Sequence, residues 1–171
     1  MNLYARAKSV TPVVISPPGI SGRLSTATAF PGLSRILLVD DEIDFWWAEC
    51  FAELVRSGCR VDTAEDGEVG WAALRANDYD LLITDNKMPK VDGLELIIHV
   101  RDQGITVPII FASSLLPGVT AEQRPYFVNV HLVEKPVTPS QLANTLHHIA
   151  LTQAWSHEAL PTTDPVALLT N

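Results

Sequence analysis

The stretch that decides the fold is Leu-Leu-Ile-Thr-Asp-Asn-Lys-Met-Pro-Lys-Val-Asp-Gly, at residues 81–93. Its first three residues are apolar and lead through a threonine to one carboxylate, Asp85, before the chain breaks at Pro89. An apolar run this short, followed by a helix breaker, predicts a buried strand with an acid at its carboxyl end. In an open parallel α/β sheet, ligands bind in the crevice outside the carboxyl ends of the strands. We therefore expect Asp85 to lie at a functional site.

Apolar runs and helical patterns alternate along the chain on both sides of this stretch. Short buried strands are predicted at residues 36–39, 60–64, 81–85, 107–111 and 131–133. Helices are predicted at residues 44–57, 66–75, 94–102, 120–124 and 138–151. Five such alternations imply an α/β fold in which a parallel sheet carries helices on both faces.

Several helix ends carry sequence signals. Asp44 is expected to cap the first helix and Gly58 to end it. Thr138 and Gln141 have the spacing of a capping box and predict the start of the last helix. The buried face of the first helix is predicted, from helical spacing, to consist of Phe45, Ala48, Ala52 and Val55. Trp46 and Trp47, being adjacent, cannot share one face, and each is expected to pack at the flank of this helix.

The length of 171 residues predicts one domain with tails. Residues 1–33 are rich in Pro, Ser, Thr and Gly and are expected to form a disordered leader. Residues 34–152 hold the predicted domain, and residues 153–171 are expected to form a flexible C-terminal tail. Neither end segment is expected to fold alone, so any output must pass through contact with another protein or through a phosphate relay.

Composition excludes several classes of function. The formal net charge of -8 argues against direct binding of nucleic acid, because phosphate backbones are bound by a surplus of Lys and Arg. No apolar stretch reaches the length needed for membrane insertion. The two cysteines, Cys50 and Cys59, lack the spacing of a zinc or redox motif and are expected to be buried and reduced, as in a cytoplasmic protein.

Polar side chains follow four of the predicted strands. Asp40 and Asp41 follow the first, Asp85 the third, Ser113 the fourth and Lys135 the fifth. These groups should converge on one crevice if the strands are parallel and adjacent. Clustered carboxylates repel one another unless a cation relieves them, and oxygen ligands of this charge suit Mg²⁺, with Mn²⁺ possible. One carboxylate can also act as a nucleophile toward phosphorus, with the metal, the lysine and the serine hydroxyl compensating charge.

Four ordered motifs then point to a family. They are LLVDDE at residues 37–42, LLITDNKMPKVDG at 81–93, PIIFASS at 108–114 and EKPVTPSQL at 134–142. Over residues 35–151 this pattern resembles the receiver domain of two-component response regulators. The resemblance implies a flavodoxin-like, doubly wound sheet of five parallel strands in the order 2-1-3-4-5.

The resemblance also assigns roles to the metal-site residues. It makes Asp85 the phosphoacceptor and Asp41 a direct Mg²⁺ ligand. Asp40 would act mainly through metal-bound water, and the backbone carbonyl of Lys87 would be a further ligand.

Three more roles follow from the resemblance. Ser113 occupies the position of the hydroxyl that turns toward the phosphoryl group. Lys135 occupies that of the lysine that pairs with the acceptor or its phosphate. Pro136 is the expected site of a cis peptide bond.

Two departures from the family pattern concern signal output. Leu132 stands three residues before Lys135, where the family commonly has Tyr or Phe, so the ring that usually reports phosphorylation is missing. Pro117, Gly118 and Pro125 interrupt the region of the fourth helix. The last motif, KPVTPSQL, further resembles receivers attached to hybrid sensor histidine kinases, which pass phosphate onward to a histidine.

Three functions remain open from the sequence. The first is a single-domain response regulator, phosphorylated by a sensor histidine kinase or a histidine phosphotransfer protein and signalling to a downstream protein target. The second is a receiver-like binding module that works without phosphorylation. The third, an aspartate-nucleophile phosphatase, is disfavoured because such enzymes carry a second Asp two residues after the nucleophile, where this chain has Lys87. Beyond gaining and losing its own phosphoryl group, the chain is not expected to be an enzyme.

Overall fold

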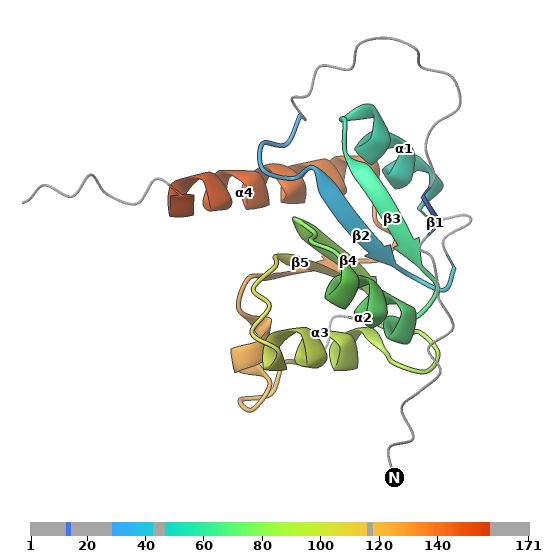
Figure 1. Cartoon of the computed structure of the whole chain (residues 1–171), viewed down its shortest axis with the longest axis vertical. Coiled ribbons are helices and arrows are strands. Elements are labelled where there is room, and N and C mark those ends of the chain that lie inside the picture. The colour runs from blue at the N-terminus through green and yellow to red at the C-terminus, as the bar shows by residue number, and fades with distance from the viewer. Residues whose placement is uncertain (1–12, 15–28, 43–46, 116–117, 158–171) are drawn as a thin grey trace, which may run out of the picture.

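The computed structural model describes residues 13–14, 29–42, 47–115 and 118–157. Its strands are β1 Val13–Val14, β2 Arg35–Val39, β3 Arg60–Ala64, β4 Leu81–Asp85, β5 Ile109–Ser113 and β6 Val130–Glu134. Its helices are α1 Ala48–Arg56, α2 Gly67–Ala76, α3 Gly93–Asp102 and α4 Pro139–His157, with a 3-10 helix, η1, at Arg124–Phe127. Figure 1 shows these elements alternating along the chain around one sheet.

The sheet has the strand order β1-β3-β2-β4-β5-β6. All pairings from β3 to β6 are parallel, with Leu37 opposite Leu82 and Leu82 opposite Ile109. Counted without β1, the five parallel strands have the order 2-1-3-4-5, which confirms the predicted topology. β1 was not predicted; it pairs antiparallel with β3 and lies within the segment expected to be a disordered leader.

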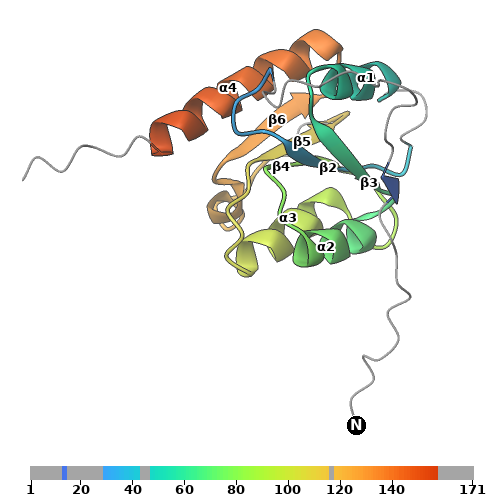
Figure 2. The same ribbon diagram turned by 45° about the horizontal axis from the view of Figure 1, so that its top comes forward.

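Helices cover both faces of the sheet, as predicted. Figure 2 shows α1 and α4 on one face and α2 and α3 on the other. Along β2, Ile36 and Leu38 pack toward α1 and α4, while Leu37 and Val39 pack toward α2 and α3. Every residue of the central strands β4 and β5 is buried, because each has a neighbouring strand on both sides and a helical layer above and below. None of the helices described is long and apolar enough to cross a membrane.

The hydrophobic core extends beyond the predicted limits of the domain. Phe30 and Leu33, which lie in the predicted leader, are buried. The Phe30 ring packs edge-on against His147 of α4, with ring centroids 4.8 Å apart. These two apolar residues flank Pro31 and Gly32 and do not follow the periodicity of a helix or a strand. The sequence therefore predicted no regular element there. The packed chain therefore begins before residue 34, and α4 continues past residue 152.

The buried face of α1 differs from the predicted one. Trp47, Cys50 and Leu54 are buried, whereas Ala48 and Ala52 are exposed. The predicted face was thus wrong by about one position of the helix. The larger side chains of Trp47 and Leu54 bury more apolar surface than the two alanines would, which favours this rotation of the helix.

The ends of α1 were predicted in part. The expected cap Asp44, with Phe45 and Trp46, lies outside the described residues; the helix described begins at Ala48. At the other end, Gly58 follows the helix with a φ of 85°, as expected for a glycine that ends a helix.

The region after β5 holds no α-helix between residues 118 and 129. The predicted helix at 120–124 is wrong; the chain instead forms turns and then η1, which carries Pro125 near its start. Proline lacks an N–H group and clashes with the preceding turn, so a helix from Thr120 cannot continue through it. By contrast, the predicted start of α4 is confirmed, since Thr138 and Gln141 exchange the two hydrogen bonds of a capping box.

Candidate functional site

Four parallel strands bring the predicted site residues together. Asp40 follows β2, Asp85 ends β4, Ser113 ends β5 and Lys135 follows β6. Asp85, Ser113 and Lys135 line a cavity of about 400 Å³ at the carboxyl ends of the strands, and the buried Asp40 reaches the site through its contact with Lys135. The residues around this cavity are Asp41, Glu42, Trp47, Asp85, Asn86, Lys87, Ser113, Ser114, Lys135, Pro136 and Val137. The crevice predicted from the strand order is therefore present.

Lys135 joins the two buried carboxylates of the site. Its Nζ lies 2.8 Å from Oδ2 of Asp40 and 2.9 Å from Oδ1 of Asp85. Burial alone would lower the pKa of the Lys135 ammonium, but the hydrogen bonds to Asp40 and Asp85 outweigh burial and raise that pKa above its usual value. The ammonium thus stays charged and supplies one positive charge between two negative ones. As predicted for position 136, the peptide bond between Lys135 and Pro136 is cis.

A third carboxylate, Asp41, lies close to the two that Lys135 pairs with. Asp40, Asp41 and Asp85 each place an oxygen so that all three oxygens lie within 4.8 Å of one another. Asp40 and Asp85 are buried, and Asp41 is exposed on the cavity side. One lysine cannot neutralise three carboxylates, so the group keeps surplus negative charge. Clustered carboxylate oxygens are the ligands of hard divalent cations, and the residues present therefore fit Mg²⁺ or Mn²⁺.

Hydrogen bonds fix the two buried carboxylates in place. Oδ1 of Asp40 accepts from the backbone N–H of Glu42 at 2.8 Å, and Oδ2 accepts from Nε1 of Trp47 at 2.6 Å. Oδ2 of Asp85 accepts from the backbone N–H of Lys87 at 3.2 Å. Lys87 therefore lies at the site, while the ligand role of its carbonyl stays a prediction.

Ser113 lies beside Asp85, because Asp85 pairs with Ala112 across β4 and β5. The Ser113 hydroxyl donates to the carbonyl of Leu115 at 2.6 Å and accepts from Nδ2 of Asn86 at 3.2 Å. The hydroxyl is thus held by its own loop and by the residue that follows Asp85. Its predicted turn toward a phosphoryl group would require these bonds to rearrange.

Two residues of the site were missed by sequence reasoning. Asn86 directly follows Asp85, and this adjacency is a signal that could have marked it. Trp47 was expected only to pack, yet its indole N–H reaches Asp40. Seven residues separate Trp47 from Asp40 across a turn, so no spacing rule could have linked them.

Two glycines let the helices on one face approach the loop after Asp85 closely. A Cβ at Gly93, the first residue of α3, would lie 2.0 Å from the carbonyl oxygen of Asp85. A Cβ at Gly67, the first residue of α2, would lie 2.3 Å from the carbonyl oxygen of Val91. Neither position can hold a side chain without moving the backbone.

Comparison with known families matches residues 36–147 to the response regulator receiver domain. This match covers well over half of the chain and includes every site residue described above. The chain belongs to the response regulator receiver family. The resemblance inferred from its four motifs is thereby confirmed.

Relatives of the receiver domain include a two-component response regulator, ORR41, from Oryza sativa, which is 41% identical over 83 residues. That match covers 47% of this chain and 65% of the rice protein. A response regulator receiver protein from Anaeromyxobacter is 36% identical over 108 residues, covering 61% of this chain and 44% of the relative. The chain therefore spans less than two thirds of the length of either relative.

Solved structures agree with the fold of the receiver domain. The response regulator TrrA from Thermotoga maritima, in complex with Mg²⁺ and BeF, is 27% identical, with a TM-score of 0.59. The match covers 68% of this chain and 99% of that one. The Vibrio cholerae chemotaxis regulator CheY4 is 26% identical, with a TM-score of 0.60, over 68% of this chain and 98% of its own.

Leu132 of this receiver domain lies on β6 opposite Phe111 of β5 and is 40% exposed. The aliphatic side chain thus stands at the sheet edge, where the family pattern commonly has a ring. With η1 in place of a helix before β6, the surface around Leu132 departs from the family pattern in both composition and backbone.

Proposed function

We propose that this receiver domain accepts a phosphoryl group on Asp85 from a phosphohistidine of a sensor histidine kinase or a histidine phosphotransfer protein. The observation that carries the proposal is the position of Asp85 on the cavity. Its carboxylate lies 2.9 Å from the Lys135 ammonium and within 4.8 Å of the oxygens of Asp40 and Asp41. The Asp85 carboxylate as nucleophile, the Lys135 ammonium and the candidate metal site thus lie at the same cavity.

The transfer is a simple displacement at phosphorus. An oxygen of the Asp85 carboxylate attacks the phosphorus, the P–N bond to the histidine breaks, and the departing imidazole takes up a proton. Lys135 can turn from Oδ1 of Asp85 to a phosphoryl oxygen, because its ammonium is a compact point charge on a flexible stem. Ser113 would donate its hydroxyl to another phosphoryl oxygen after releasing Leu115.

Mg²⁺ would be held by Asp41 and Asp85, by the backbone carbonyl of Lys87, and by Asp40 through water. Bound there, the ion would neutralise charge on the transferring phosphoryl group. The donor set of this chain supports the assignment, since three carboxylates lie together and only Asp40 and Asp85 are paired with an ammonium. Asp40, at the end of the buried strand β2, would orient the site, while Lys135 would follow the phosphoryl group.

The proposed setting is cytoplasmic signalling by contact between proteins or by phosphate relay. The formal charge of -8 makes direct binding of nucleic acid unfavourable. The proposed chemistry is limited to gain and loss of the chain's own phosphoryl group, with no separate substrate turned over.

Phosphorylation by a small phosphodonor tests this function. With acetyl phosphate and Mg²⁺, the wild-type chain should gain the mass of one phosphoryl group, and chelation of the metal should prevent the gain. Asp85→Asn should abolish the adduct, because the amide is a far weaker nucleophile. The exposed Asp78 offers a matched control, and Asp78→Asn should be phosphorylated like the wild type. An undiminished adduct on Asp85→Asn, or none on the wild type, would refute the proposal.

A second candidate function is a receiver-like module that binds its target without phosphorylation. It is favoured by the exposed Leu132 and by η1, since both alter the surface next to β6. The two functions differ in how target affinity responds to beryllofluoride, which mimics the phosphoryl group. Equal affinity with and without beryllofluoride would support the second candidate, and a change of tenfold or more would support the first.

A further inference from the structure

The Trp47 indole is part of the site rather than of the core alone. Its side chain is almost fully buried, contacts the cluster of Cys50 and Leu54, and also lines the cavity. Its N–H points at Oδ2 of Asp40 with a donor–acceptor distance of 2.6 Å. This distance is slightly shorter than the usual range for N–H groups that donate to carboxylates.

The acceptor positions of Asp40 show what this bond does. A carboxylate offers about four acceptor positions, two on each oxygen. Oδ2 accepts from both Trp47 and Lys135, and Oδ1 accepts from the Glu42 N–H. Asp40 is therefore turned so that its remaining acceptor position lies on Oδ1. That position is the one left for a metal-bound water.

Lys135 cannot hold Asp40 throughout the proposed reaction. The same ammonium bonds Asp40 at 2.8 Å and Asp85 at 2.9 Å, and a phosphoryl group on Asp85 would draw it away. The indole N–H is on a rigid, buried ring and has no such second partner. It can keep Oδ2 of Asp40 in place when the lysine moves.

We infer that Trp47 is a positioning residue, which acts through Asp40 to hold the acidic site ready for Mg²⁺ and for phosphoryl transfer. This inference rests on the proposed function of Asp85. It differs from a packing role because a phenyl ring could fill most of the same space but could not donate to Asp40. The N–H group, rather than the bulk of the ring, carries the effect.

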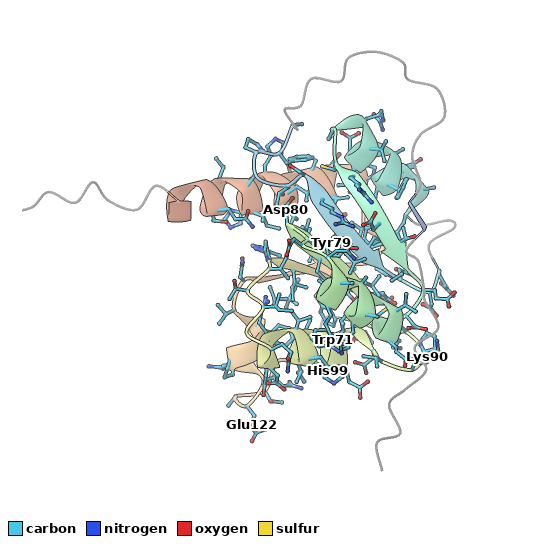
Figure 3. All side chains as sticks on the ribbon, in the orientation of Figure 1. Trp71, Tyr79, Asp80, Lys90, His99 and Glu122 are labelled. Carbon is cyan, nitrogen blue, oxygen red and sulfur yellow. The ribbon has the colours of Figure 1, made fainter. Side chains whose placement is uncertain are left out.

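Trp47→Phe tests the inference, with Trp71→Phe as the matched control. Trp71 lies on α2 beside His99 of α3, with ring centroids 6.1 Å apart, and does not line the cavity (Figure 3). By calorimetry, Trp47→Phe should weaken Mg²⁺ binding about tenfold, the usual effect of losing one hydrogen bond to a charged group. Its phosphorylation by acetyl phosphate at saturating Mg²⁺ should slow by a similar factor. Trp71→Phe should change neither quantity by more than twofold.

The failure of this inference is distinguishable from failure of the proposed function. If wild type binds Mg²⁺ and takes up phosphate while Trp47→Phe stays within twofold of it, Trp47 only packs. If the wild type does neither, the proposed function itself fails. Thermal unfolding without Mg²⁺ shows whether Trp47→Phe is folded.

A second measurement uses protein in which Trp47 itself is not mutated. In a chain where Trp46, Trp71 and Trp155 are replaced by Phe, the fluorescence of Trp47 should change as Mg²⁺ is added. The midpoint should agree with that from calorimetry, because the indole is bonded to a carboxylate of the site. Unchanged fluorescence at saturating Mg²⁺ would contradict the inference.

Discussion

Two charged clusters on the same sheet balance charge in opposite ways. Around Asp85, three carboxylates lie close together, and the single ammonium of Lys135 pairs with two of them, Asp40 and Asp85. Around Asp62, in the middle of β3, one fully buried carboxylate accepts from two guanidinium groups and a phenol. The first cluster carries surplus negative charge that an ion can relieve, and the second is complete within the chain. Surplus negative charge, rather than burial itself, distinguishes the candidate site from a structural ion pair.

The donors around Asp62 come from three parts of the chain. Arg35 of β2 donates at 2.7 Å, Arg60 of β3 at 3.3 Å and the Tyr79 hydroxyl at 3.0 Å. Burial alone would raise the pKa of Asp62, but these hydrogen bonds and charges outweigh burial and lower it below the usual range. The stability from this carboxylate is therefore present above its unfolded pKa and is lost as the pH falls through the lower folded value.

The largest expected effect on stability comes from breaking the balanced cluster. Asp62→Ala leaves two guanidinium groups and a phenol without their shared acceptor. We expect a loss of about 2 to 3 kcal/mol in the free energy of unfolding, below the usual 3 to 5 because Arg35 and Arg60 reach solvent. Urea unfolding measures the loss. The control Asp78→Ala, at an exposed carboxylate, should change stability by less than about 0.5 kcal/mol. A similar loss for both variants would refute the special role of Asp62.

A smaller and metal-dependent effect is expected at the unbalanced cluster. Lys135→Met leaves the buried Asp40 and Asp85 without their cation. Without Mg²⁺, we expect a loss of about 1 to 2 kcal/mol, below the usual 3 to 5 because the side chains of Lys135 and Asp85 reach solvent. Added Mg²⁺ should then raise the melting temperature of Lys135→Met more than that of the wild type. An equal rise in the two proteins would show that the lysine does not compensate the acidic group.

The smallest expected effect, at Tyr79, should disappear at high pH. Burial and the hydrogen bond to Asp62 raise the pKa of Tyr79 from 10.0 to about 12. A folded pKa above the unfolded one means that the stability from Tyr79 is full below pH 10 and is lost as the pH rises toward 12. Tyr79→Phe should cost about 1 kcal/mol at pH 8. The difference between the two proteins should shrink between pH 10 and 12 in denaturant unfolding, and a constant difference would contradict this assignment.

The sequence predicted the sheet and the converging residues because both follow from local patterns. Short apolar runs ending in Asp40 and Asp85 sufficed, since parallel strands bring their carboxyl ends to one edge. The Trp47 bond to Asp40 and the packing of Phe30 on α4 could not be predicted in this way. Each depends on a contact across a turn or across the fold, and neither leaves a periodic trace in the sequence.

The helix predicted at residues 120–124 is wrong because contacts distant in the sequence also determine this segment. Pro117, Gly118 and Pro125 leave room for only a short helix between them, and Thr120 does form a local turn with Gln123. Pro125 then ends any α-helical continuation, while Tyr126 and Phe127 pack toward the core as part of η1. The aromatic contact of Phe127 with Phe111, and not helix propensity, decides the path of this segment.

The close approach of Gly93 to Asp85 has a mechanical consequence. Because a Cβ on Gly93 would lie only 2.0 Å from the Asp85 carbonyl oxygen, the first turn of α3 abuts this peptide group directly. No compressible side chain lies between them to absorb a displacement. A movement of the Asp85 backbone toward α3 would therefore displace the start of the helix. For the same reason, only glycine is tolerated at position 93.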